Sequence, residues 1–239
     1  MNVAMIFAGG TGKRMHTNGV PKQFLELYGK PIIIYTLEQF ENHDDVDCIV
    51  ISCLEKWIPK LWKLCQKFHI SKVQSIVAGG ETGQESIYHG LLKANEIAGP
   101  DAIVLVHDGV RPLVDPATIS ANIKMAREKG DAITVTPAIE TIFVNGEEGE
   151  VGEILDRSQC ELAKAPQTFR LGELLKCHEK ARADGINNFI DSANMFRHYG
   201  KKLYTVQGRT ENIKITTPVD YYIFKAIVTA RESSNAFGL

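Results

Sequence analysis

Short apolar runs alternate with longer amphipathic stretches in the first 136 residues, and this rhythm constrains the fold more than any other feature of the sequence. The stretches between the runs are long enough for helices. Strands that alternate with helices form parallel sheets, because two parallel strands cannot be joined by a tight turn. We therefore predict an α/β fold with a mostly parallel sheet flanked by helices. The predicted strands are Val3 to Ala8, Cys48 to Cys53, Val73 to Val77, Ile103 to Val106 and Ile133 to Thr136.

Local signals place helices within this pattern. Asp115 and Pro116 supply an N-cap and an N1 proline for a helix that runs toward Lys129. Pro31 begins another helix, which we expect to end near Phe40. The later predictions are helices over Leu171 to Ala183, Asp191 to Tyr199 and from Pro218 toward Glu232, a strand over Leu203 to Gln207, and a frayed tail over Ser233 to Leu239.

The rhythm breaks after Thr136. Two short apolar runs, Ile142 to Val144 and Glu153 to Leu155, flank a turn-rich connector over Asn145 to Gly149. This spacing is typical of a β-hairpin. We predict an arm over about residues 138–160 that projects from the sheet of a single domain spanning residues 1–239.

The overall charge excludes several classes of partner. The net charge is −2, from 27 Lys and Arg against 29 Asp and Glu, and the basic residues are scattered. No general field therefore favours a nucleic acid or a membrane surface, and an anion site must be local. The apolar runs are too short to cross a bilayer and no signal peptide is readable, so we expect a cytoplasmic protein. The five cysteines form no CxxC pair, which argues against a zinc site or a disulfide framework.

A glycine-rich loop directly follows the first predicted strand. The segment Ala8 to Arg14 (AGGTGKR) has three glycines, so that backbone N–H groups can face an anion, and two cations that balance its charge. It lacks the ending of a Walker A motif and the acidic residue of a dinucleotide fingerprint. Lys22 follows at a distance that brings a second ammonium to a triphosphate. An ordinary turn between a strand and a helix can have the same composition as this loop.

Four segments, in this order, resemble the motifs of one enzyme family. They are the glycine loop, Pro21 to Phe24 (PKQF), His107 to Pro112 (HDGVRP) and Glu211 to Pro218 (ENIKITTP). With them the chain resembles the IspD/TarI cytidylyltransferases from about Asn2 to Glu232. The resemblance implies a Rossmann-like nucleotidyltransferase fold, CTP and a polyol phosphate as substrates, a Mg²⁺ requirement and a homodimer with exchanged arms.

The resemblance also implies how the phosphates of CTP are held. The attacking phosphate is already an anion, so the reaction needs charge neutralisation and in-line positioning more than proton transfer. Arg14 and Lys22 are implied to stabilise charge on the α-phosphate and the leaving pyrophosphate, and Lys214 to approach the same phosphate. A lone Lys or Arg is usually a solvated surface side chain, but these three lie in separate family motifs. The implied CTP-binding residues are Ala8, Gly9, Gly10, Thr11 and Gly12 at the phosphates, and Gly80, Glu81 and Ser86 at the base and ribose.

Asp108 is the predicted magnesium ligand. It follows an apolar strand, at the carboxyl end where open α/β sheets bind ligands, and its carboxylate is a hard ligand suited to Mg²⁺. His107 has little to do as a base, because the nucleophile needs no deprotonation, and we interpret it as structural. Arg111 is predicted to hold the acceptor phosphate or to order the site, and a salt-bridging arginine is the competing interpretation.

Thr141 and Arg157 lie at the two ends of the predicted arm and match the family's acceptor-phosphate clamp, which the resemblance places across the dimer.

Two positions depart from the family pattern. Gly83 stands where family members often have arginine, which affects the base pocket. Lys164 and Ala165 stand where the family usually has Gln-Thr before Pro-Gln, which affects packing on the acceptor side.

The acceptor divides the family into two branches. Pro31 to Glu38 and Val110 to Pro112 resemble the ribitol-phosphate branch, so D-ribitol 5-phosphate or a related pentitol phosphate is favoured, for teichoic acid or capsule synthesis. Asp191 to Ala193 and His198 to Gly200 resemble the other branch, so 2-C-methyl-D-erythritol 4-phosphate, of isoprenoid synthesis, is the alternative.

A catalytically silent nucleotide-binding scaffold is an alternative of a different class, because a fold does not fix its chemistry. The intact set of Arg14, Lys22, Asp108 and Lys214 argues against it.

Overall fold

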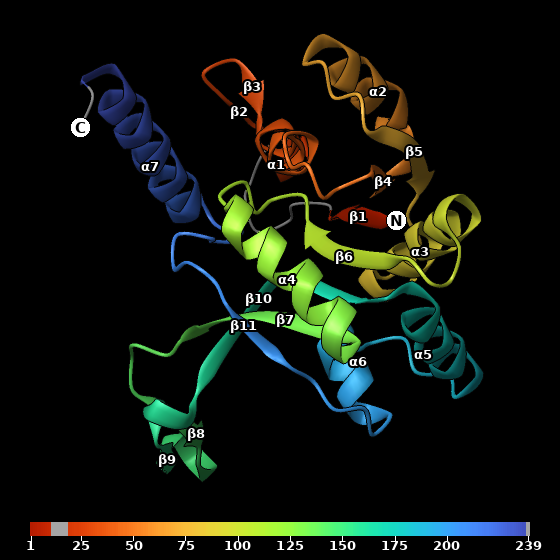
Figure 1. Cartoon of the computed structure of the whole chain (residues 1–239). Coiled ribbons are helices and arrows are strands. Elements are labelled where there is room, and N and C mark those ends of the chain that lie inside the picture. Colours follow the sequence, from red (N-terminus) through yellow and green to blue (C-terminus); the bar gives the residue numbers. More distant parts are fainter. Residues whose placement is uncertain (11–18, 238–239) are drawn as a thin grey trace.

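A seven-stranded sheet divides the molecule into two helical layers (Figure 1). The structure is a computed structural model that describes residues 1–10 and 19–237. Its central strands are β1 (Asn2–Ala8), β4 (Cys48–Cys53), β5 (Val73–Ala78), β6 (Ile103–Asp108), β7 (Asp131–Pro137), β10 (Glu161–Arg170) and β11 (Thr205–Gln207). The strand order is β11-β7-β10-β6-β1-β4-β5. All neighbours are parallel except β10, which is antiparallel to both β6 and β7.

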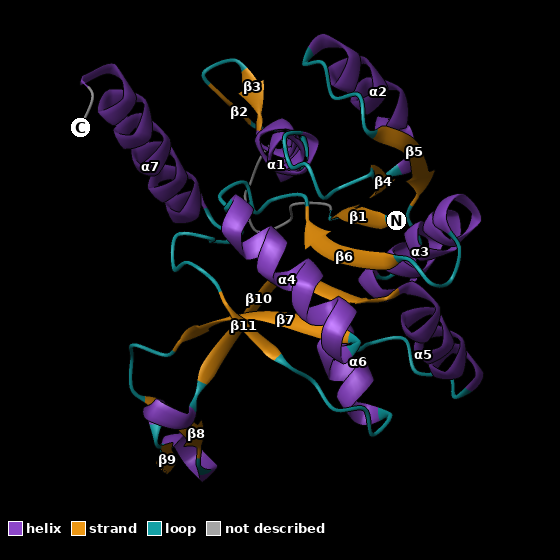
Figure 2. Ribbon diagram, viewed as in Figure 1, coloured by secondary structure: helices purple, strands orange, loops and turns teal. Residues whose placement is uncertain are grey.

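Helices cover both faces of this sheet (Figure 2). One apolar cluster joins it to α1 (Ile32–Glu41), α2 (Ile58–Lys67) and α4 (Pro116–Lys129), and a second joins it to α3 (Gly83–Ala98), α5 (Leu171–Ala183) and α6 (Ser192–His198). Strand β1 serves both clusters, because successive side chains point to opposite faces. Ala4 and Ile6 belong to the first cluster, and Val3 and Met5 to the second. Burying an Ile or Met side chain contributes about 1.5–3 kcal/mol to stability.

The predicted fold class is confirmed, and the five predicted strands match β1, β4, β5, β6 and β7 within two residues. The predicted signals for α4 are also present. The side chain of Asp115 accepts a hydrogen bond from the N–H of Thr118, and Gly130 ends the helix in the left-handed region at φ 101°. Helix α1 begins after Pro31, as the sequence predicts.

Strand β10 was missed by the sequence analysis, because its segment ELAKAPQTFR contains a proline and no continuous apolar run. A central strand tolerates proline where the ladder is interrupted. The register of β10 against β7 shifts between Ala163 and Gln167, and the hydroxyl of Thr134 donates to the carbonyl oxygen of Pro166 at 2.7 Å. The irregularity thus lies in the middle of the sheet.

Helix α7 (Pro218–Phe237) corrects another prediction, since it continues through Ser233 to Phe237 where a frayed tail was expected. The last two residues lie outside the described part. At its start α7 packs on α1 and on a small unpredicted hairpin of β2 (Glu26–Leu27) and β3 (Lys30–Pro31). Phe224 is fully buried and meets the ring of Tyr35 edge-on at 5.2 Å.

A second two-stranded sheet projects from the body, formed by β8 (Ile142–Asn145) and β9 (Val151–Leu155) (Figure 1). Its apolar side chains face solvent: Phe143 is 48% exposed and Ile154 65%. A lone two-stranded hairpin is marginally stable in water. Its exposed apolar surface is therefore suited to a partner. No described helix is both long and apolar enough to span a bilayer.

His178 lies buried between α5 and α3. Its ring stacks on Tyr88 at 5.8 Å, and neither ring nitrogen has a hydrogen-bond partner among the described residues. Burial, together with repulsion from Arg182, lowers the pKa of His178 to about 4. The folded protein therefore holds this imidazole neutral.

Because His178 is buried in its neutral form, we predict that it makes the free energy of unfolding depend on pH, and that His178→Phe removes this contribution. An unfolded histidine has a pKa of about 6.5, so the unfolded chain binds the proton first and stability falls as the pH drops from about 6.5 to about 4. Protonation of this histidine in the unfolded chain therefore lowers the free energy of unfolding of the wild type at pH 5 by about 2 kcal/mol relative to pH 7. Urea denaturation at both pH values should show a smaller pH effect in the variant. The exposed His198, changed to Gln, is the control and should keep the wild-type difference; equal pH dependence in His178→Phe would contradict the assignment.

Candidate functional site

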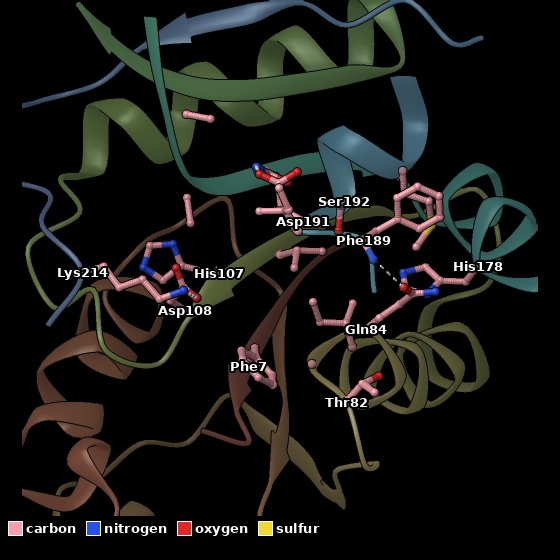
Figure 3. Close-up of a pocket in the computed structure, with 18 of the residues that line it drawn as sticks. Phe7, Thr82, Gln84, His107, Asp108, His178, Phe189, Asp191, Ser192 and Lys214 are labelled. Carbon is pink, nitrogen blue, oxygen red and sulfur yellow. Dashed lines mark hydrogen bonds and ion pairs between the residues drawn. The ribbon is translucent and has the colours of Figure 1, made fainter. Parts of the chain in front are cut away.

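A cavity of about 610 Å³ opens at the carboxyl ends of β1 and β6 (Figure 3). Its size suits a small-molecule ligand. Lys214, His107 and Asp108 lie toward one end of the cavity, and Gln84, His178 and Phe189 toward the other (Figure 3). The cavity is lined by β6 and the turn after it (Asp108, Arg111), by β10 (Ala163, Lys164, Ala165, Gln167), by the start of α3 (its N-cap Thr82, and Gln84) and by the segment 187–192.

An ion cluster of Asp108, Arg111 and Lys214 forms one wall. The Asp108 carboxylate accepts from Arg111 Nε at 2.9 Å and pairs with Lys214 Nζ at 2.7 Å. Burial acts to raise the pKa of Asp108, but the charges of Lys214 and Arg111 outweigh it and lower that pKa to about 2. Asp108 is therefore ionised at neutral pH, and the cluster keeps one net positive charge. The structure thus brings together three predicted site residues.

The backbone around the cluster fixes the cations in place. Arg111 Nη1 donates to the carbonyl oxygen of Asn212 at 2.9 Å, and the N–H of Ile215 donates to the carbonyl oxygen of Val110 at 2.9 Å. The side-chain amide of Asn212 donates to the carbonyl oxygen of Ala165 at 2.7 Å. Ile215 is fully buried in the apolar cluster beneath α7. The segment that carries Lys214 is therefore tied to β6 and β10.

His107 is buried beside this cluster. Its Nε2 lies 3.1 Å from the carbonyl oxygen of Arg111, and its ring meets Phe40 at 5.0 Å. Burial lowers the pKa of His107 to about 4, although the hydrogen bond to Arg111 and the charge of Asp108 oppose this shift. A neutral, packed imidazole fits the structural interpretation.

Two glycine turns meet at Ser86, at the start of α3. The Ser86 hydroxyl accepts from the N–H of Gly80 at 3.0 Å and donates to the carbonyl oxygen of Thr82 at 2.8 Å. A Cβ on Gly9 would lie 3.2 Å from this hydroxyl and 2.9 Å from the ring of Phe7. A Cβ on Gly79 would lie 2.8 Å from the same oxygen. The absence of a side chain at Gly9 and Gly79 therefore allows the carboxyl ends of β1 and β5 to pack against Ser86 of α3.

Thr82 is the N-cap of helix α3. The N–H of Glu85 donates to Thr82 Oγ1 at 3.1 Å, and the Glu85 carboxylate accepts from the N–H of Glu81 at 2.9 Å. Helix α3 starts at Gly83. Gly80 and Ser86, two predicted base-side residues, are thus in contact, while Glu81 is exposed.

The glycine loop after β1 is partly described. Ala8 ends β1, Gly9 and Gly10 follow, and Thr11, Gly12 and Arg14 lie outside the described residues. The side-chain amide of Gln23 donates to the carbonyl oxygens of Ala8 at 2.6 Å and of Gly10 at 3.2 Å. Lys22 Cε is 3.9 Å from the place of a Cβ on Gly10. The structure therefore brings the lysine of the PKQF segment to the glycine loop.

Thr141 and Arg157 lie at the base of the projecting hairpin and do not line the cavity of their own chain. Both are exposed, and Arg157 Nη1 donates to the carbonyl oxygen of Ile139 at 3.0 Å. Within one chain the structure does not bring them to Asp108. Their role across a dimer stays a prediction.

The sequence analysis missed the wall over residues 186–193, which two glutamines hold. Gln84 donates to the carbonyl oxygen of Ile186 at 2.8 Å and accepts from the N–H of Phe189 at 3.1 Å (Figure 3). Gln167 donates to Asp191 Oδ2 at 2.9 Å and accepts from the N–H of Ala193 at 3.0 Å. Each amide bridges elements far apart in sequence, so no local signal could reveal the wall.

The chain is similar to known cytidylyltransferases over almost its whole length. The family model "2-C-methyl-D-erythritol 4-phosphate cytidylyltransferase" (IspD) matches residues 2–230. The chain is 50% identical over 238 residues to a ribitol-5-phosphate cytidylyltransferase of Vibrio parahaemolyticus, with 100% of both chains covered. It is 38% identical over 229 residues to a 2-C-methyl-D-erythritol 4-phosphate cytidylyltransferase of Clostridium acetobutylicum, covering 95% of this chain and 97% of that protein.

A solved structure shows the same fold. The 4-diphosphocytidyl-2C-methyl-D-erythritol synthase of Anaerococcus prevotii superposes with a TM-score of 0.83 at 23% identity, with 96% of each chain covered.

The ion cluster predicts an energetic coupling between Asp108 and Lys214. A double-mutant cycle with Asp108→Asn and Lys214→Met should give a coupling of about 1 kcal/mol in the free energy of unfolding, a modest value because the lysine is 40% exposed. The more exposed pair Glu173–Lys176 is the control and should couple by less than about 0.5 kcal/mol. Urea denaturation of the single and double variants measures both, and equal values for the two pairs would contradict the structural role of the cluster.

Proposed function

We propose that this chain, which belongs to the IspD cytidylyltransferase family, transfers CMP from CTP to D-ribitol 5-phosphate and releases CDP-ribitol and pyrophosphate. One observation carries the acceptor: identity to the ribitol-5-phosphate enzyme is 50% over the whole chain, against 38% to the methylerythritol enzyme. A related pentitol phosphate has the same chemistry. 2-C-methyl-D-erythritol 4-phosphate is the second candidate, because the family model carries its name.

The reaction exchanges one phosphoanhydride bond for another. An oxygen of the acceptor phosphate attacks the α-phosphorus of CTP, a new P–O bond forms, and the bond to the β-phosphate oxygen breaks as pyrophosphate leaves. The nucleophile is already ionised, so the chain must mainly align the two anions and offset their charge. His107, buried and neutral, has no proton to remove. The cluster around Asp108 supplies preset positive charge instead.

Each predicted cation has a place in this scheme. Lys22, held next to Gly10, faces the phosphates of CTP together with Arg14 and the loop backbone. Lys214 stabilises the α-phosphate, where charge grows toward the transition state. Arg111 orients the acceptor phosphate. Asp108 keeps Lys214 and Arg111 in position before substrates bind.

Asp108 also fits a magnesium ion. Its carboxylate is ionised, lines the cavity and offers hard oxygen ligands. The described residues contain no group of three or more His, Cys, Asp or Glu side chains that could hold a metal. Mg²⁺ suits such a site, because it takes few protein ligands and completes its octahedron with water and phosphate oxygens. When bound with CTP, Mg²⁺ supplies further positive charge to the phosphates.

The base and ribose of CTP are assigned to the glycine turns at the start of α3. Gly80 and Ser86 form a rigid backbone surface there, and Glu81 lies at its exposed edge. Gly83 lines the cavity without a side chain, where family members often carry arginine. The base pocket is therefore more open on this side.

A homodimer with exchanged arms completes the proposal. The hairpin of β8 and β9 exposes apolar side chains, and a second copy would cover them. Thr141 and Arg157 would then reach the acceptor bound by the partner chain. We assign the protein to the cytoplasm and its CDP-ribitol to teichoic acid or capsule synthesis. A non-catalytic scaffold would have no need of the Asp108 ion cluster.

The function is tested by pyrophosphate release with a panel of substrates. CTP with D-ribitol 5-phosphate and Mg²⁺ should give turnover, while ATP, GTP and UTP should be at least about 10-fold poorer, because a pocket that pairs with cytosine leaves polar groups unpaired with another base. 2-C-methyl-D-erythritol 4-phosphate is the comparison acceptor. Faster turnover with it would move the chain to the isoprenoid branch, and no pyrophosphate release from CTP with any polyol phosphate would contradict the enzyme assignment.

The dimer predicts that two inactive variants complement each other. Arg157→Ala and Asp108→Asn lie on opposite sides of a shared site, so a mixed dimer holds one site without either lesion. Random refolding makes about half of the dimers mixed, and about a quarter of wild-type activity should return. Each variant refolded alone is the control. Mixed dimers proved by mass spectrometry but without activity would mean that the arm serves its own chain.

A further inference from the structure

Lys164 places a third cation on the wall of the cavity. It lines the same space as Arg111 and Lys214, and no described carboxylate forms an ion pair with it. Within the described part of the chain its ammonium makes long contacts, to the carbonyl oxygens of Asn212 at 3.4 Å and Thr210 at 3.5 Å. Asn212 also accepts from Arg111 at 2.9 Å, so the two cations share one acceptor. Lys164 is therefore weakly satisfied by the protein itself.

The local charge balance favours an anion beside Lys164. Burial and the nearby charge of Arg111 both lower the pKa of Lys164, which means that its charged form is held at a cost. Arg111, Lys164 and Lys214 line the cavity together with two carboxylates, Asp108 and Asp191. The cations therefore outnumber the carboxylates by one, and Asp108 already pairs with Arg111 and Lys214, so Lys164 is the cation left without an ion pair among the described residues. A phosphate monoester carries about −1.5 to −2 at pH 7 and offers three acceptor oxygens.

The irregularity in β10 explains why a lysine can point there. In a regular strand alternate residues face opposite sides, so Lys164 would point away from the side of Ala163 and Ala165. The register shift between Ala163 and Gln167 breaks this alternation, and all four of Ala163, Lys164, Ala165 and Gln167 line the cavity. Bulges commonly redirect a side chain beside an active site. The two small alanines leave room around the ammonium.

The position of β10 separates Lys164 from the nucleotide loop. In the sheet, β10 and β1 are the two neighbours of β6, and the glycine loop follows β1. Lys164 and the glycine loop thus lie on opposite sides of Asp108. An anion at Lys164 is on the side away from the phosphates assigned to CTP.

We infer that Lys164 binds the phosphate group of the acceptor and, together with Arg111, holds it on the β10 side of Asp108. This inference rests on the proposed function, because it takes the glycine loop as the CTP side. It gives a role to the departure from the family pattern at this position. Lys164 is a substrate-binding residue that acts mainly before the chemical step.

Steady-state kinetics of Lys164→Met test this role, since methionine keeps the apolar stem and removes the charge. The KM for D-ribitol 5-phosphate should rise about 10- to 100-fold, as expected for loss of a hydrogen bond to a charged group, while the KM for CTP changes less than about 2-fold. Lys164→Arg should recover the acceptor KM to within about 5-fold, because it restores the charge. Lys124→Ala, an exposed position on α4, is the matched control and should leave all constants unchanged.

Two further measurements separate the possible failures. In the reverse direction the KM for pyrophosphate should stay unchanged in Lys164→Met; an increase there, or in the KM for CTP, would place Lys164 on the nucleotide side and overturn the inference. An unchanged acceptor KM would overturn it as well.

Calorimetric titration of D-ribitol 5-phosphate, in the presence of a non-hydrolysable CTP analogue, reports binding without turnover. Weaker binding to Lys164→Met than to the wild type would support the role of Lys164 in binding the acceptor. This holds even if the wild type released no pyrophosphate, because that result would contradict the proposed function alone. No binding to the wild type would overturn both.

Discussion

The ion cluster of Asp108, Arg111 and Lys214 is the interaction on which the site depends. A buried carboxylate is costly unless cations and hydrogen bonds compensate it, and here two cations do so. The carboxylate comes from the end of β6, Arg111 from the turn after it, and Lys214 from a segment more than 100 residues later. The sheet supplies the carboxylate, and the apolar cluster under α7 holds the segment that carries Lys214. Fold and charge distribution therefore depend on each other.

The antiparallel insertion of β10 shapes the other half of the site. It lies between β6 and β7 in an otherwise parallel sheet, so its middle passes the end of β6 where Asp108 lies. Its register shift exposes Lys164 and Ala165 to the cavity, and Gln167 then anchors the start of α6. One irregular strand thus provides the charged side chain of Lys164 and also the glutamine that holds the wall over residues 186–193. A continuous parallel strand at this place would provide neither.

Most of the sheet and two of the three described cations of the cavity, Arg111 and Lys214, could be predicted from the sequence, because both have local signals. Apolar runs mark β1, β4 and β6, and short ordered motifs mark Asp108 and Lys214. Strand β10 has no such signal, since proline and alternating small residues hide it. The amide bridges of Gln84 and Gln167 join residues far apart in the chain, so only the folded structure reveals them. The residues 11–18 of the glycine loop lie outside the described part, and their roles stay predictions.

The two sides of the cavity differ in how freely they can change. At the glycine turns, which we propose as the CTP side, Ser86 fits between Gly9 and Gly79 with no room for a further Cβ, so substitutions there disturb the ends of β1 and β5 together. On the opposite side, the wall consists of a strand irregularity and a loop held by two side-chain amides. Changes at Lys164 or Ala165 need not move Asp108 or the cations it holds, because those are anchored by Asn212 and Ile215. The β10 wall can therefore change while the ion cluster and the glycine turns stay in place.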